Sequence, residues 1–149
     1  DEDGQDRVIG MICVAKDSQE TVLVISEKGF GKRTALDDEN GEPVYRITNR
    51  GGKGVKTMNL TDKTGYLIGL DAVTDDMDLM LITKSGTAIR MAMDTIRVMG
   101  RATQGVKLIE LQKRNDTLMS GCTVPKEEET DEVADAPAEG AEQTTENEQ

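Results

Sequence analysis

A short pattern of glycines and cations occurs twice in the chain and limits the fold more than any other feature. Arg50-Gly51-Gly52-Lys53-Gly54-Val55-Lys56 and Arg101-Ala102-Thr103-Gln104-Gly105-Val106-Lys107 share one frame, an Arg, three residues and then Gly-Val-Lys. Glycine in such a turn allows φ > 0 and leaves backbone N–H groups open to an anion. One occurrence alone is equally well explained as a solvated hairpin. The recurrence favours a repeated structural unit.

The apolar runs around this pattern repeat in the same order. Runs of strand length occupy 22–25 and 79–83, and a closing run at 67–73 returns at 118–124 and at 8–14. The distance between equivalent glycines is 57 residues from Gly29 to Gly86, and 51 residues from Gly54 to Gly105. A period of about 50 to 60 residues with about four strands per unit is typical of propeller-like blades.

We therefore predict an all-β fold of antiparallel four-stranded blades. Further strands are expected at 31–36, within 45–60, and at 94–99, where Ile96 and Val98 are β-branched. Two blades do not close a ring, so this is a piece of a larger toroid or it pairs through exposed edges. The predicted organisation is an acidic linker at 1–6, a partial propeller at 7–124 and a disordered acidic tail at 125–149. The propeller comprises a closing strand at 7–14, a blade at 20–73 and a blade at 77–124.

Charge is distributed unevenly along the chain. The net charge is −11, but residues 125–149 hold ten acids and one base, and residues 1–6 hold four acids. Residues 7–124 therefore carry +2, a mildly basic body attached to an acidic tail. Because few apolar residues occur after position 126, that segment is expected to be disordered.

Neither a membrane segment nor a secretory signal is expected. No apolar run approaches the roughly 18 residues that span a bilayer, and the N-terminus is acidic. The sequence predicts a cytoplasmic protein. Cys13 and Cys122 lie in apolar runs and are predicted to be buried, reduced thiols.

The residues that catalysis requires are not gathered in any stretch. The chain has no histidine, and the Gly-Lys pair at 31–32 lacks the spacing of a phosphate-binding P-loop. Asp75, Asp76 and Asp78 suggest a cation site or a turn before a strand, and the turn is the simpler explanation. We predict no catalytic residue, no metal and no cofactor in this chain.

Duplex DNA fits the cations better than an enzymatic substrate does. The cations fall at predicted turns and strand ends, from which they can project along one rim toward phosphates. Aromatic residues make up 2% of the chain, which disfavours stacking on unpaired bases. The candidate DNA-binding residues are Lys28, Lys32, Arg33, Arg46, Arg50, Lys53, Lys56, Arg90, Arg97, Arg101 and Lys107. The candidate turn glycines are Gly29, Gly51, Gly52, Gly54, Gly86 and Gly105.

The blades resemble the C-terminal domain of the DNA gyrase A protein. The resemblance rests on the stretches 24–34, 50–56, 81–90 and 100–106, in that family's order and spacing. It implies a β-pinwheel whose basic rim bends duplex DNA, so that the whole enzyme adds negative supercoils with ATP and Mg bound on other parts. It also implies two partners, the rest of the gyrase A protein and the gyrase B protein.

Two departures and two alternatives accompany this resemblance. The family's wrapping box begins Gln-Arg-Arg-Gly-Gly-Lys-Gly, whereas Thr48-Asn49-Arg50 precede Gly51 here, which suggests a later-blade equivalent. The region of the cleavage tyrosine is absent from this sequence. The alternatives are the C-terminal domain of the topoisomerase IV A protein and a propeller-like protein-interaction module.

Overall fold

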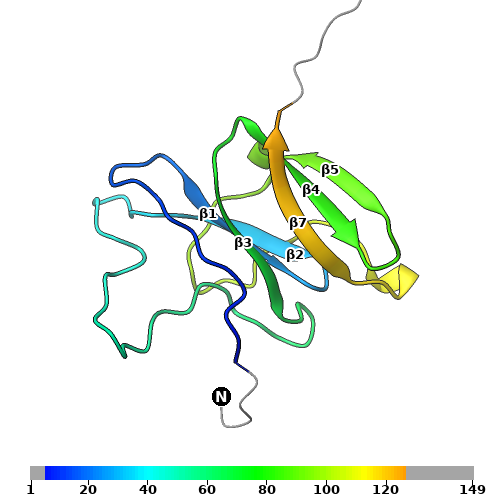
Figure 1. The fold of residues 1–149 in the computed structure, drawn as a ribbon, viewed down its shortest axis with the longest axis horizontal. Coiled ribbons are helices and arrows are strands. Elements are labelled where there is room, and N and C mark those ends of the chain that lie inside the picture. The colour runs from blue at the N-terminus through cyan, green and yellow to red at the C-terminus, as the bar shows by residue number, and fades with distance from the viewer. Residues whose placement is uncertain (1–5, 127–149) are drawn as a thin grey trace, which may run out of the picture.

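Two antiparallel β-sheets form the protein, as a computed structural model describes for residues 6–126 (Figure 1). The first unit of the repeat supplies β1 (Thr21–Ser26), β2 (Phe30–Ala35) and β3 (Leu67–Val73). The second unit supplies β4 (Met77–Thr83), β5 (Ala88–Ala92), β6 (Val106–Lys107) and β7 (Leu118–Pro125). Two short 3-10 helices, η1 (Met93–Thr95) and η2 (Gln112–Arg114), lie in the connections of the second unit.

Each unit builds the same three-stranded arrangement of a hairpin and a closing strand. In the first sheet β1 lies between β2 and β3, and in the second sheet β4 lies between β5 and β7. The registers agree, since Ile25 pairs with Gly31 in the first hairpin and Ile82 pairs with Ala88 in the second. A register shift follows both Ile25 and Ile82, on the side of the closing strand. The predicted repeat is thus an internal structural repeat, and the all-β fold is confirmed.

The fourth strand of the first sheet comes from the second unit. β6 pairs with β2 through Phe30↔Lys107 and Gly31↔Val106, giving the strand order β3-β1-β2-β6. The corresponding stretch of the first unit, Val55–Lys56, forms no strand. The two units are therefore linked by one strand, which the second unit adds to the sheet of the first.

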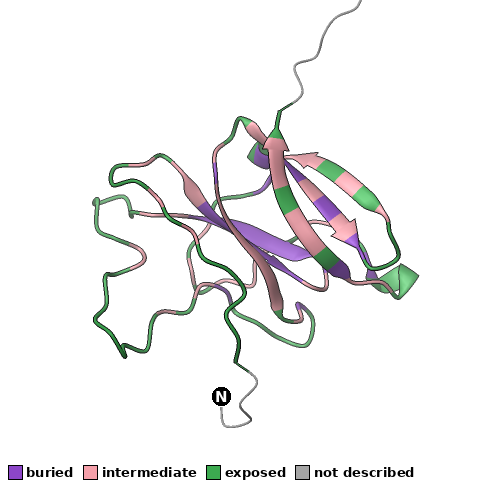
Figure 2. Ribbon diagram, in the orientation of Figure 1, coloured by how far each residue is buried: buried purple, intermediate pink, exposed green. Residues whose placement is uncertain are grey.

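The main core lies between the two sheets. β1 is buried on both faces because its side chains alternate between two apolar clusters (Figure 2). Leu23 and Ile25 join Leu79 and Leu81 of β4 in the cluster between the sheets, whereas Val22 and Val24 face a second cluster that includes Phe30 and Met58. This explains why β1 reads as a continuous apolar run rather than an alternating one.

Three expected strands are not strands in the structure. Residues 8–14 have no regular secondary structure and form no ladder. Ile12 packs on the second cluster, whereas Val8 and Met11 are about nine-tenths exposed. Residues 45–60 are irregular loop. Within 94–99, η1 replaces the start of the expected strand, and only Val98 forms a bridge, parallel to Arg33 of β2. A strand requires a partner for its N–H and C=O groups, and sequence propensity does not supply one.

Both cysteines differ from the prediction in exposure. Cys13 and Cys122 are free thiols, as expected, but both are exposed, because Cys13 lies in the unpaired N-terminal segment and Cys122 on an outward position of β7. None of the helices within residues 6–126 is long and apolar enough to cross a membrane. The predicted linker and tail lie, except for Asp6, Pro125 and Lys126, outside the described residues.

Candidate nucleic-acid interface

The loop of the first unit between residues 45 and 58 presents cations on a fixed base. Met58 is buried in the second cluster, and the Tyr45 hydroxyl lies 2.7 Å from the Thr57 hydroxyl, which ties the two ends of the loop together. At the tip, the Gly52 N–H donates to the Asn49 carbonyl over 3.0 Å. Four cations of this loop are exposed and have no side-chain hydrogen bond or ion pair with residues 6–126, and these are Arg46, Arg50, Lys53 and Lys56.

The equivalent loop of the second unit, residues 100–107, lies directly beside it. Nη1 of Arg101 donates to the Lys56 carbonyl over 3.0 Å, and the Asn59 N–H donates to the Thr103 carbonyl over 2.9 Å. Nε2 of Gln104 also donates to the Thr61 hydroxyl over 2.8 Å. The two recurrences of the sequence pattern are therefore neighbours in space, and their cations share one surface.

Two lysines extend this surface around the single phenylalanine. Nζ of Lys63 lies 5.6 Å and Nζ of Lys107 lies 5.9 Å from the centroid of the Phe30 ring, within cation–π range. Lys107 also pairs with Glu110 over 2.7 Å, and this hydrogen bond lowers the pKa of the Glu110 carboxyl. Sequence analysis missed Lys63, although its place in the polar turn 61–65 is the same signal that selected the other cations.

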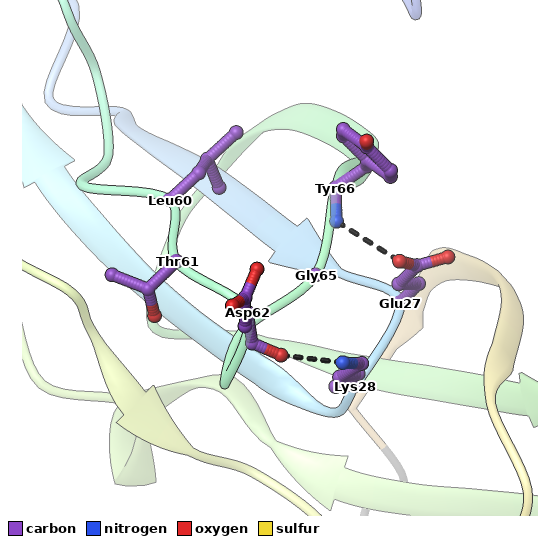
Figure 3. A pocket seen from close by; sticks show the side chains of 7 residues that line it. All are labelled: Glu27, Lys28, Leu60, Thr61, Asp62, Gly65 and Tyr66. Carbon is purple, nitrogen blue, oxygen red and sulfur yellow. Dashed lines mark hydrogen bonds between the residues drawn. The ribbon is translucent and has the colours of Figure 1, made fainter.

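Lys28 lies at the tip of the β1–β2 hairpin, beside a hollow of about 270 Å³ (Figure 3). Its ammonium donates to the Asp62 carbonyl, and the Tyr66 N–H donates to the Glu27 carboxylate over 3.2 Å. These contacts fix the turn 61–65 against the hairpin. Lys28 is therefore half-buried and holds the turn that carries Lys63.

Lys32 and Arg33 do not project from a rim, and this part of the prediction is wrong. Both are buried on β2, because the loop 100–103 covers Lys32 on one face of the first sheet and Met93 and Thr21 contact Arg33 on the other. Burial, and to a lesser degree the charge of Arg101, lowers the pKa of Lys32 to about 8. Arg33 donates through Nη1 to Asp75 over 2.6 Å and to the Met93 carbonyl over 3.1 Å, and through Nε to Thr21.

The cations of the second sheet are dispersed. Arg90 occupies the position on β5 that Arg33 occupies on β2, and its Nε pairs with Asp78 over 2.7 Å. Arg97 is exposed in the connection that follows η1. Of the three aspartates considered as a cation site, Asp75 pairs with Arg33, Asp78 pairs with Arg90, and Asp76 accepts a hydrogen bond from the Thr74 hydroxyl. Among residues 6–126 no cluster of His, Cys, Asp or Glu could hold a metal ion.

The candidate turn glycines differ in backbone conformation and in their surroundings. Gly29, Gly51, Gly54, Gly86 and Gly105 all have positive φ, whereas Gly52 does not. A Cβ on Gly54 would meet nothing within 4 Å, but one on Gly105 would lie 2.7 Å from the Gly31 carbonyl oxygen. Gly105 is therefore required for the close approach of β6 to β2.

Comparison with known proteins shows the family. The family model described as "DNA gyrase C-terminal domain, beta-propeller" matches residues 20–74 and 78–120, one segment for each structural unit. The chain belongs to the DNA gyrase C-terminal domain family. The first segment spans the β1–β2 hairpin and all of β3, and the second spans the β4–β5 hairpin from Asp78 onward and the start of β7, so the family match follows the structural repeat.

Curated relatives agree with this assignment. The chain is 45% identical over 132 residues to the DNA gyrase A protein of Campylobacter fetus, and 40% identical over 128 residues to that of Staphylococcus aureus (strain NCTC 8325 / PS 47). The aligned parts cover 87% and 86% of this chain. They cover 14% of each relative, so the chain spans about one seventh of the length of these proteins.

Solved structures show the same fold. The structure titled "Structure of DNA gyrase A C-terminal domain" matches with a TM-score of 0.57 and 25% identity, over 69% of this chain and 33% of that one. The structure titled "Crystal structure of the C-terminal domain of DNA topoisomerase IV" matches with a TM-score of 0.62 and 18% identity, over 76% and 32%. The second similarity concerns the fold alone, and the identities of the curated relatives place the sequence with gyrase.

Proposed function

We propose that this gyrase-family domain binds and bends duplex DNA through contacts to backbone phosphates. The observation that carries the proposal is the side-by-side packing of the two glycine-rich loops, with Arg101 bonded to the backbone of Lys56. Each loop presents cations beside turns of small residues, and phosphates repeat along duplex DNA at a spacing that neighbouring loops can follow. Sequence would enter only through how easily the DNA bends.

The proposed interface consists of surface cations. Its members are Lys28, Arg46, Arg50, Lys53, Lys56, Lys63, Arg97, Arg101 and Lys107. Lys32 and Arg33 are left out because they are buried, and Arg90 because it pairs with the largely buried carboxylate of Asp78, whereas the Glu110 partner of Lys107 is exposed. In the full-length relatives the same surface would wrap DNA for ATP-dependent negative supercoiling, together with the rest of the gyrase A protein and with the gyrase B protein.

A filter-binding titration of a duplex at several salt concentrations tests the proposal. Changing Arg50, Lys53 and Lys56 to Ala removes up to three phosphate contacts, which should lower the log–log salt slope by up to about 2.7. The matched control changes Lys84, Lys113 and Arg114 to Ala, an equal change of charge on exposed residues of the β4–β5 turn and η2. In Figure 1 these elements lie at the opposite side of the molecule from the loop 45–58.

The outcomes separate the candidate functions. A lower slope for the loop variant and a nearly unchanged slope for the control would support phosphate contacts by this loop. Equal changes in both variants would mean that only net charge matters. Binding that is absent at low salt in the parent protein would favour the protein-interaction module instead.

A further inference from the structure

Lys32 is a fully buried lysine whose charge has no role in the proposed contacts with DNA. Its side chain has 0% exposure, and its ammonium donates to the Gly100 carbonyl over 2.7 Å, to the Thr103 hydroxyl over 3.1 Å and to the Arg101 carbonyl. An ammonium has three N–H donors, so each is used. All three acceptors belong to one loop of the neighbouring unit.

The loop that Lys32 holds is itself attached to the first loop. Its Arg101 side chain donates to the Lys56 carbonyl, and its Thr103 carbonyl accepts the Asn59 N–H. From this loop the chain passes through Gly105 into β6, which completes the first sheet beside β2. The buried ammonium therefore lies where the strand of one unit and the cationic loops of both units meet.

The second unit shows that the blade itself does not need a lysine here. Lys32 pairs with Val24 in the first hairpin, and the residue in the same register of the second hairpin is Ile89, which pairs with Leu81. β5, which carries Ile89, is an edge strand of the described part of the chain, with no loop of carbonyls beside it. Burying an ammonium is unfavourable unless it is fully hydrogen-bonded. A lysine therefore occurs only at the one of the two equivalent positions that has a loop of hydrogen-bond acceptors beside it.

We propose that Lys32 is a positioning residue for the candidate DNA interface. Its ammonium anchors the loop 100–105 and so fixes the Arg101 side chain beside the loop of Arg50 and Lys56. The role in DNA binding rests on the function proposed above, whereas the anchoring of the loop does not. The two parts are tested by separate measurements.

Amide hydrogen exchange of the whole 149-residue chain tests the anchoring. Lys32→Met keeps the apolar stem but removes the three donors, so the Asn59 amide, which donates to Thr103, should exchange at least tenfold faster than in the parent. Amides of β1 and β4 should keep their protection. Ile89→Met changes the equivalent position of the second sheet and should leave Asn59 unchanged. An Asn59 amide as protected in Lys32→Met as in the parent would overturn the proposal.

A double-mutant cycle on duplex binding tests the positioning role. If Lys32 acts through Arg101, Lys32→Met and Arg101→Ala should each lower the salt slope by up to about 0.9. The loss of affinity between 50 and 200 mM salt should then be about threefold smaller than in the parent. The double variant should bind no more weakly than Arg101→Ala alone. Fully additive losses would show that Lys32 does not act through Arg101, and would overturn its positioning role.

Thr103→Val covers the case in which Lys32→Met does not fold. It removes one acceptor of the same ammonium from a half-buried loop position, so it should speed exchange at Asn59 in the same direction by a smaller factor. Unchanged exchange at Asn59 in this variant would also overturn the anchoring. A parent protein that does not bind duplex DNA would refute the proposed function, while the exchange results would still decide whether Lys32 anchors the loop.

Discussion

Adjacent residues of β2 show how the position of a side chain decides what its charge does. Lys32 and Arg33 point to opposite faces of the first sheet, because side chains alternate along a strand. Lys32 meets the loop 100–103, and Arg33 meets η1 and the turn that carries Asp75. Each cation therefore joins the first unit to a different part of the second unit.

The first residue-scale prediction concerns pH and Lys32. Its pKa is about 8 in the folded protein, below the usual 10.5 that holds in the unfolded chain. Between these values the unfolded chain binds more protons, so the free energy of unfolding should rise with pH from about 8 toward 10.5. Urea unfolding of the parent and of Lys32→Met across this range measures the difference. A difference that stays constant or falls with pH would contradict the buried charge.

A second residue-scale prediction compares two glycines with positive φ. Gly54→Ala should lower the free energy of unfolding by about 1 kcal/mol, because alanine is strained in the left-handed conformation although its Cβ has free space. Gly105→Ala should cost about 2–4 kcal/mol, because its Cβ also meets the Gly31 carbonyl. Urea unfolding of both variants provides the comparison. Equal costs would mean that β6 moves aside easily.

At the scale of elements, pairing explains what could and could not be predicted. Both hairpins and both closing strands could be predicted from apolar runs and turn glycines. The two strands of each hairpin are close in sequence, and each closing strand recurs at the same place in its unit. The stretch 8–14 has the same apolar character as β3 and β7, yet no strand pairs with it among residues 6–126. The propensity of a stretch for the strand conformation does not reveal whether a partner strand is present.

The candidate interface divides in the same way. Cations in loops were identified because charge and glycine are visible in the sequence, and the packing of the two loops agrees with their recurrence. The burial of Lys32 was not visible, because it depends on a loop about 70 residues away. The alternating pattern around Phe30 and Lys32 does not indicate which cation a loop distant in sequence will hydrogen-bond. Tertiary contacts of this kind set the limit of the prediction.

An element-scale prediction concerns the contacts of Arg33 with the second unit. Arg33→Met should cost about 2–4 kcal/mol, since it leaves the Met93 carbonyl without this donor in the buried core. Arg90→Met is the matched variant on β5, and should cost about 1 kcal/mol, because the Arg90 side chain is 33% exposed, against 5% for Arg33. Chemical denaturation measures both. A larger loss of stability in Arg90→Met than in Arg33→Met would contradict the stabilising role given to the contacts of Arg33 with the second unit.

At the scale of the whole molecule, opposite charges are segregated along the chain. Residues 127–149 hold ten acids and no base, whereas residues 6–126 carry a net charge of +2. A tethered polyanion has a high effective concentration near the basic loops, so it should compete with DNA for them. We therefore predict that the affinity for duplex DNA depends on the acidic segment 127–149.

Removal of residues 127–149 tests that dependence. The net charge changes from −11 to −1, and duplex binding should tighten several-fold at low salt, with the gain fading as salt screens both interactions. Filter binding of the two forms over a range of salt concentrations measures the effect. Identical affinities across the range would show that the acidic segment does not reach the interface.

The position of β6 in the first sheet has a consequence for the order in which the sheets can form during synthesis. Gly31 and Val106 pair although they are 75 residues apart. More than half of this chain must therefore emerge from the ribosome before the first sheet gains its last strand. Until then β2 keeps an open edge in the nascent protein, where another strand could pair with it. The first unit is contiguous in the sequence, but its sheet is complete only when a strand of the second unit joins it.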